Sequence, residues 1–187
     1  MPERNITRYC VIITAVFVAA TLVGFLAPIP GKRELFGDLI DAFEPFLTLP
    51  PWKMFFVILL NNSAKSFAIL LSGILFGLVP LIAVATNGYI LGVAYLFASG
   101  KVGYVQAAKT VLHHGVLEIP AIVLSVAYGL WLGVTFARRI RRRDMAGFGD
   151  QVIHGIRMFF KVAFPLFVLA ALIETFLIIS MGGGVPR

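Results

Sequence analysis

Residues 9–29 read YCVIITAVFVAATLVGFLAPI, an apolar run without a charged side chain. Its length matches the roughly 20 residues that an α-helix needs to cross the hydrocarbon core of a bilayer. Arg4 and Arg8 precede the run, so a cleavable signal peptide is the competing interpretation. The run is longer than the ~7–15 residues of a signal peptide's apolar region, and no A-x-A cleavage site follows it. We therefore expect a retained membrane anchor.

The composition of the whole chain supports the same class. Of its 187 residues, 59% are hydrophobic and 13% are charged, and the mean hydropathy is +0.94. Soluble domains are usually about 45–50% apolar and about 25% charged. We predict an all-α, polytopic transmembrane helix bundle that forms a single integral membrane domain over residues 1–187.

Four further apolar segments follow the first, which predicts five spans in all, at about 9–29, 53–79, 81–98, 110–137 and 158–180. Pro80 separates the second span from the third. The second carries NNSAK in its middle, so it is either one long helix or two helices that break at Asn61. Between the first two spans, residues 33–48 place apolar side chains three and four apart and acidic ones on the other face. This pattern predicts an amphipathic helix at the membrane surface.

Basic residues predict the orientation. The net charge is +7, and the run RRIRRR at residues 138–143 holds much of the basic charge. Such a run beside an apolar segment is typical of a cytoplasmic anchor, and it argues against nucleic-acid binding. With the loop 138–157 in the cytoplasm of a cell membrane, the amino terminus is also cytoplasmic and the carboxyl terminus lies outside. The single cysteine, Cys10, is interpreted as a small apolar residue.

Glycines four residues apart occur in three of the spans. Small residues at this spacing allow the backbone of a neighbouring helix to approach closely. We therefore interpret them as helix-packing residues of a tight bundle, with the lining of a conduction path as the alternative. The six positions are Gly73, Gly77, Gly88, Gly92, Gly129 and Gly133.

Ionisable residues occur within the spans, most densely in LHHGVLEIP at residues 112–120. His114 and Glu118 are four residues apart and share a helix face. Pro120 cannot donate a hydrogen bond to the carbonyl of Val116, which leaves an acceptor free nearby. Glu174 in the last span lies at the same depth as Glu118, ~10 Å below the outer surface at ~1.5 Å per residue.

Isolated charges at this depth cost several kcal/mol, so they normally face the protein interior and pair. We predict that Glu118 and Glu174 face each other. The full candidate ligand- or ion-binding set is His114, Glu118, Glu174, Asn61, Asn62, Lys65 and Asn87.

Three roles are open for this set: a polar network that fixes helix register, a site for an ion, proton or polar ligand, or catalysis. His114, Glu118 and Glu174 would be the ligands of any metal, although His113 faces away and HExxH spacing is lacking. No nucleotide, hydrolase or dinucleotide motif occurs, so we expect neither an enzyme nor a cofactor. His154, in the basic loop, is expected to be solvated.

Several elements recur in the order typical of one family. They are NNSAKSFAILLSGILFGLVPLIAVATNGYILG, then HHGVLEIPAIVLSVAYGLWLG, then ALIETF. Together they resemble the stage II sporulation protein M family over roughly residues 61–176. The resemblance implies a membrane component of a peptidoglycan-remodelling complex that anchors wall hydrolases without being one. Many relatives occur in prokaryotes that do not sporulate, so sporulation itself is not adopted as a function.

Two hypotheses from different classes follow. The first is a non-enzymatic membrane scaffold or complex subunit that self-associates through its glycine-rich faces. Its partners would be membrane lipid, further copies of the chain and other membrane or cell-envelope proteins. The alternative is a small transporter or channel in which His114, Glu118 and Glu174 bind a cation or proton. An intramembrane metalloprotease is a distant third.

Overall fold

The computed structural model describes residues 3–27, 31, 34, 37 and 49–180, while the side chains of residues 3–5 and 110–114 are outside the description. The predicted amphipathic helix at 33–48 therefore lies almost entirely outside the described residues. Within the described part, the chain forms helices and no strands. These are α1 (Glu3–Leu26), α3 (Pro51–Ser72), α4 (Leu78–Val102), α5 (Tyr104–Arg142), α6 (Phe148–Met158), the π-helical turn η1 (Phe159–Ala163) and α7 (Phe164–Ser180).

Five of the helical segments in the described residues are long and apolar enough to cross a membrane. They are Ile6–Leu26, Pro51–Ser72, Leu78–Val102, Gly115–Arg142 and Phe148–Ser180. The predicted all-α, polytopic architecture with five spans is confirmed. Four of the predicted span boundaries nevertheless lie well away from the helix ends in the structure.

The boundary between α3 and α4 corrects the predicted spans 53–79 and 81–98. α3 continues through Asn61 without a break and ends at Ser72. Residues 73–77 form a turn in which Phe76 (φ 56°) and Gly77 (φ 74°) adopt left-handed backbone conformations. Pro80 lies in the first turn of α4, where the missing N–H would have no helical partner, so it does not separate the two helices.

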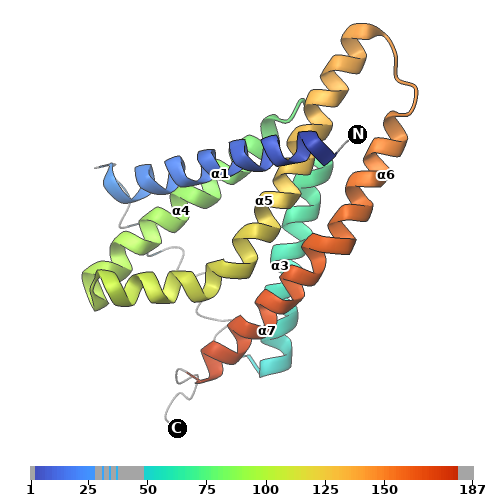
Figure 1. Ribbon diagram of the computed structural model, residues 1–187. Coiled ribbons are helices and arrows are strands. Elements are labelled where there is room, and N and C mark those ends of the chain that lie inside the picture. Colours follow the sequence, from blue (N-terminus) through green and yellow to red (C-terminus); the bar gives the residue numbers. More distant parts are fainter. Residues whose placement is uncertain (1–2, 28–30, 32–33, 35–36, 38–48, 181–187) are drawn as a thin grey trace.

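α5 extends beyond both ends of the predicted span 110–137. Only Gly103, at φ 81°, lies between it and α4, and the helix then continues to Arg142. Figure 1 shows the first part of α5 running across the lower left of the molecule, below α4, before the helix bends upward. Pro120 lies inside the helix, where a proline removes one hydrogen bond and bends the axis.

The predicted span 158–180 and loop 138–157 are also corrected. α6 begins at Phe148 and continues through η1 into α7, so the connection after α5 is a short turn. Pro165 cannot donate to the carbonyl of Lys161, and its ring would clash there in a regular α-helix. The wider π-helical turn contains Lys161 and accommodates this proline.

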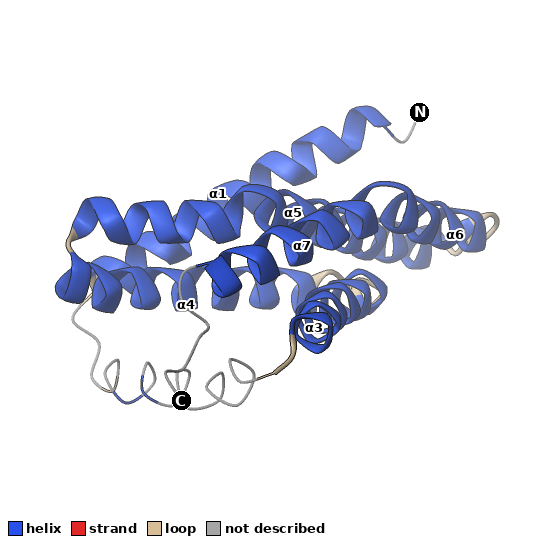
Figure 2. Ribbon diagram, turned by 90° about the horizontal axis from the view of Figure 1, so that it is seen from below, coloured by secondary structure: helices blue, strands red, loops and turns tan. Residues whose placement is uncertain are grey.

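α5 is the central helix of the bundle. Of its membrane-span window, 56% is buried, against 17–28% for the other four spans. One apolar cluster joins α5 to α3 and α7 through residues such as Leu70, Leu132 and Phe167. A second cluster joins α5 to α1 and α4 through residues such as Ile13 and Val84. Seen from below, α1 and α3 accordingly lie on opposite sides of α5 (Figure 2).

Candidate functional site

The turn between α3 and α4 rests directly on the glycine face of α5. A Cβ atom built on Gly73 would overlap the carbonyl oxygen of Gly129 and lie 2.6 Å from its carbonyl carbon. A Cβ atom on Gly133 would overlap the backbone nitrogen of Gly77 and lie 2.5 Å from the carbonyl oxygen of Gly73. Because the neighbouring atoms are backbone, they cannot rotate away from a larger side chain.

α1 and α4 approach each other equally closely. A Cβ atom on Gly88 would lie 2.5 Å from the carbonyl oxygen of Phe17, and one on Gly92 would lie 2.8 Å from the backbone nitrogen of Phe25. All six glycines of the three sequence pairs are buried against this chain's own backbone. Their faces are therefore occupied within the molecule, which leaves no glycine face of these three pairs for contact with a second copy of the chain.

Glu118 and Glu174 lie at the same end of the cluster between α5 and α7. These helices run in opposite directions (Figure 1), and Ala121 and Ala171 belong to one apolar cluster. Glu118 comes one turn before Ala121, and Glu174 comes one turn after Ala171. Both glutamates are half-buried. His114 lies on α5 one turn before Glu118, but its side chain is outside the description. That all three face one another stays a prediction.

Thr175 is a polar residue of this region that the sequence reasoning missed. Its side chain is 7% exposed, and its hydroxyl has no hydrogen-bond partner among the described residues. It follows Glu174 directly and lies four residues after Ala171, on the buried face of α7. A threonine in a helix normally satisfies itself on a backbone carbonyl one turn earlier. The only sequence signal was a polar residue beside a glutamate in an otherwise apolar span.

The polar residues of α3 and α4 divide into two groups. Asn61 and Asn62 are half-buried, and the Asn61 side-chain amide donates a 3.1 Å hydrogen bond to the Asn62 side-chain oxygen. Lys65 on α3 and Asn87 on α4 are exposed, and the Asn87 amide donates to the carbonyl of Ala83 at 3.0 Å. The predicted set is therefore not gathered in the interior, because Lys65 and Asn87 point away from it.

No three histidine, cysteine, aspartate or glutamate side chains lie close enough to hold a metal ion in the part of the chain that is described. The His114 imidazole falls outside that part, so the suggested set of His114, Glu118 and Glu174 is not tested.

His154 does not lie in a solvated loop, contrary to expectation. It is part of α6 and half-buried, and its ring packs edge-on against Tyr128 and Trp131, with centroids 5.9 and 6.1 Å away. The expectation failed because the connection after α5 is short, which brings α6 back along α5.

Five apolar spans, two cores that share α5, and polar side chains within the spans define a polytopic α-helical membrane protein. The family model of stage II sporulation protein M matches residues 13–177. The chain belongs to this family. No curated protein and no solved structure gives a significant match to it.

Proposed function

We propose that this protein is a non-enzymatic membrane scaffold, a complex subunit that holds a transmembrane helix of a partner protein against α3 and α4. The amino terminus and the α5–α6 turn lie in the cytoplasm, and the carboxyl terminus lies outside. The observation that carries the proposal is the exposure of Lys65 and Asn87 well inside apolar helices.

Both residues lie at membrane depth. Lys65 is ~10 Å along α3 from the helix end at Ser72, and Asn87 is ~14 Å along α4 from its start at Leu78, at ~1.5 Å per residue. Large apolar side chains are exposed on the same two helices, as the 61% exposure of Leu60 and the 65% exposure of Ile82 illustrate. A charged side chain facing lipid at such a depth costs about 2.5 kcal/mol or more. A partner helix that supplies a hydrogen-bond acceptor relieves this cost.

Replacement of Lys65 tests the proposal. Membranes containing wild-type protein are extracted into native nanodiscs, and the particle mass is measured. We expect a wild-type particle that holds additional protein, which Lys65→Leu releases. Lys161→Leu, which removes an exposed cation on η1 instead, should retain it. A wild-type particle with one copy of the chain and no other protein would contradict the proposal. Particles of equal mass from Lys65→Leu and Lys161→Leu would contradict it as well.

A small transporter or channel is the second candidate. It is supported by the half-buried Glu118 and Glu174 at one end of a cluster, and by the buried Thr175 hydroxyl, which has no hydrogen-bond partner among the described residues. Carboxylates and hydroxyls are ligands for hard cations. Uptake of a cation or proton by proteoliposomes, abolished by Glu118→Gln, would favour this candidate. Absence of uptake by the wild-type protein under a cation gradient and under a pH gradient would remove it.

A further inference from the structure

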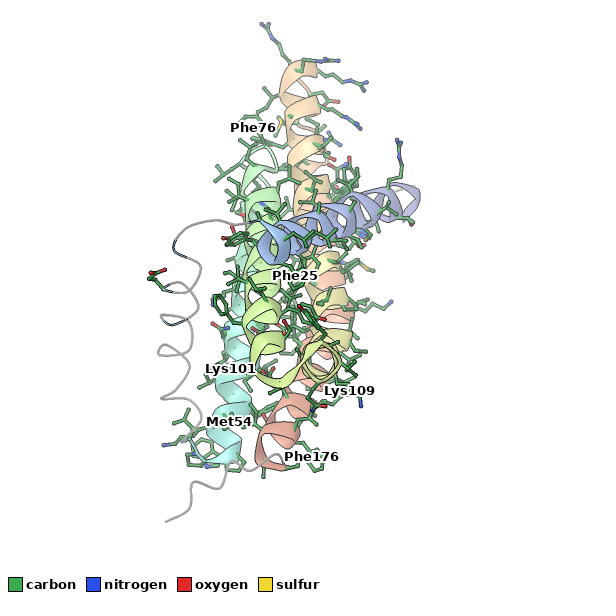
Figure 3. All side chains as sticks on the ribbon, turned by 90° about the vertical axis from the view of Figure 1, so that its left-hand side faces the viewer. Phe25, Met54, Phe76, Lys101, Lys109 and Phe176 are labelled. Carbon is green, nitrogen blue, oxygen red and sulfur yellow. The ribbon has the colours of Figure 1, made fainter. Side chains whose placement is uncertain are left out.

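The end of α5 projects beyond the rest of the bundle. Phe136 of α5 lies level with the α3–α4 turn, because its ring packs 5.8 Å from that of Phe76. Figure 3 labels Phe76 near the upper end of the molecule, with α5 continuing above it. The six residues that follow Phe136, up to Arg142, add ~9 Å at ~1.5 Å per residue. This length carries the last turns of α5 from the hydrocarbon core into the headgroup layer.

The hairpin formed by the end of α5 and the start of α6 is held in one shape. Arg139 reaches across it and donates to the side-chain oxygen of Gln151 at 3.3 Å and to the carbonyl of Ala146. The Asp144 carboxylate accepts a 3.0 Å hydrogen bond from the Ala146 amide. The rings of Phe136 and Phe148 pack at 5.3 Å below the tip. Arg139 is thus the one arginine of the run that is engaged in holding the turn.

The remaining arginines of the run are exposed: Arg138, Arg141, Arg142 and Arg143. The first three share a helix face, since they are three and four residues apart. Residues 138–150 contain five arginines and two aspartates, Asp144 and Asp150, so the tip keeps a net positive charge. Guanidinium groups bind phosphate oxygens through paired hydrogen bonds.

Exposed apolar side chains lie on the same hairpin as these arginines. Ile140 is 47%, Met145 is 45% and Ile153 is 54% exposed. A hairpin that exposes both guanidinium groups and apolar side chains suits the boundary between lipid headgroups and acyl chains. A polyanion in water would complement the charges and leave the apolar groups exposed.

We propose that the α5–α6 hairpin is a binding site for anionic lipid headgroups, with Arg138, Arg141 and Arg142 as the phosphate ligands. This site is independent of the scaffold surface on α3 and α4. One arginine close to the membrane surface gives about a fivefold preference for anionic over zwitterionic lipid, and this sets the smallest loss expected when all three arginines are replaced.

The test uses the full chain in phosphatidylcholine vesicles that contain spin-labelled phosphatidylglycerol or spin-labelled phosphatidylcholine. Electron paramagnetic resonance gives the association constant of the first lipid relative to the second. We expect the wild-type protein to prefer phosphatidylglycerol, and the triple variant R138Q/R141Q/R142Q to lose at least fivefold of that preference. The matched control K53Q/K101Q/K109Q removes three exposed cations at the opposite end, where Figure 3 labels Lys101 and Lys109. This lysine variant should keep most of the preference for phosphatidylglycerol.

Several results would overturn the site: no lipid preference in the wild-type protein, an unchanged preference in a folded arginine variant, or an equal loss in the lysine control. Binding of polyuridylate by the detergent-solubilised protein, without a lipid preference, would assign the arginines to a nucleic acid instead. If the arginine variant does not fold, the wild-type preference is measured at about 0.5 M salt, where screening must weaken it. A preference that does not fall with salt contradicts the proposal.

Discussion

Replacing Gly133 with alanine tests one of the closest backbone contacts among the described residues. The added Cβ atom would overlap the backbone nitrogen of Gly77, and it would lie 2.5 Å from the Gly73 carbonyl oxygen and 2.6 Å from the Gly77 Cα atom. All three obstacles are backbone atoms of the α3–α4 turn. The variant can therefore fold only if the whole turn moves away from α5.

The expected loss of stability follows from this geometry. Overpacking of a dense core costs about 1–3 kcal/mol, and obstacles that cannot change rotamer place this site at the upper end. A loss of about 3 kcal/mol in a chain of this size lowers the melting temperature by roughly 6–12 °C.

The assay is thermal unfolding of purified protein in mild detergent, followed by the fluorescence of Trp131, which is 6% exposed and two residues from Gly133. Gly100→Ala is the matched control, because a Cβ atom on this exposed glycine of α4 would meet nothing within 4 Å. It should be neutral, or stabilising by up to about 1 kcal/mol through helix propensity. Equal melting temperatures for Gly133→Ala and Gly100→Ala would refute the packing argument.

Three further predictions concern the buried polar groups and the orientation. Thr175→Val should raise the free energy of unfolding by about 1 kcal/mol, since it removes a buried unsatisfied hydroxyl at constant shape; a destabilised variant would mean that the hydroxyl has a partner. Glu118→Gln should keep the melting temperature if Glu118 belongs to a structural network, whereas Glu118→Leu should lower it as partners lose hydrogen bonds; stabilisation of the wild-type protein by a divalent cation, lost in Glu118→Gln, would indicate an ion site. A cysteine at Gly149 in a Cys10→Ser background should resist an impermeant thiol reagent in intact cells, and one at Lys53 should react; the reverse pattern would invert the proposed orientation.

The sequence predicted the helical membrane class, the number of spans and the family, because apolar runs such as residues 9–29 are long and the family elements recur in order. It placed the helix ends poorly. Pro80 suggested a break, yet a proline is accepted in the first turn of a helix, and Gly77 supplies the actual turn. The basic run suggested a loop, yet arginines are good helix formers and α5 continues through them to Arg142.

The candidate site was harder to predict, because a residue's type does not show which way its helix is turned. Lys65 was assigned to the interior because a charge that faces lipid is costly. The buried face of α3 includes Ser63, Ser66 and Leu70, however, and Lys65 falls outside it. The only sequence signal for Thr175 was its place beside Glu174 in an apolar span, which does not show whether its hydroxyl is buried. Its burial emerged only when the packing of α7 was known.

The central claim is that the surface around Lys65 contacts protein and not lipid, and photo-crosslinking in intact membranes measures this directly. A photoreactive amino acid replaces Ala68, which is exposed on α3 one turn from Lys65, or Leu169, which is 49% exposed on α7. We predict a discrete protein adduct from position 68, and lipid adducts alone from position 169. Lipid adducts alone from both positions would contradict the scaffold function.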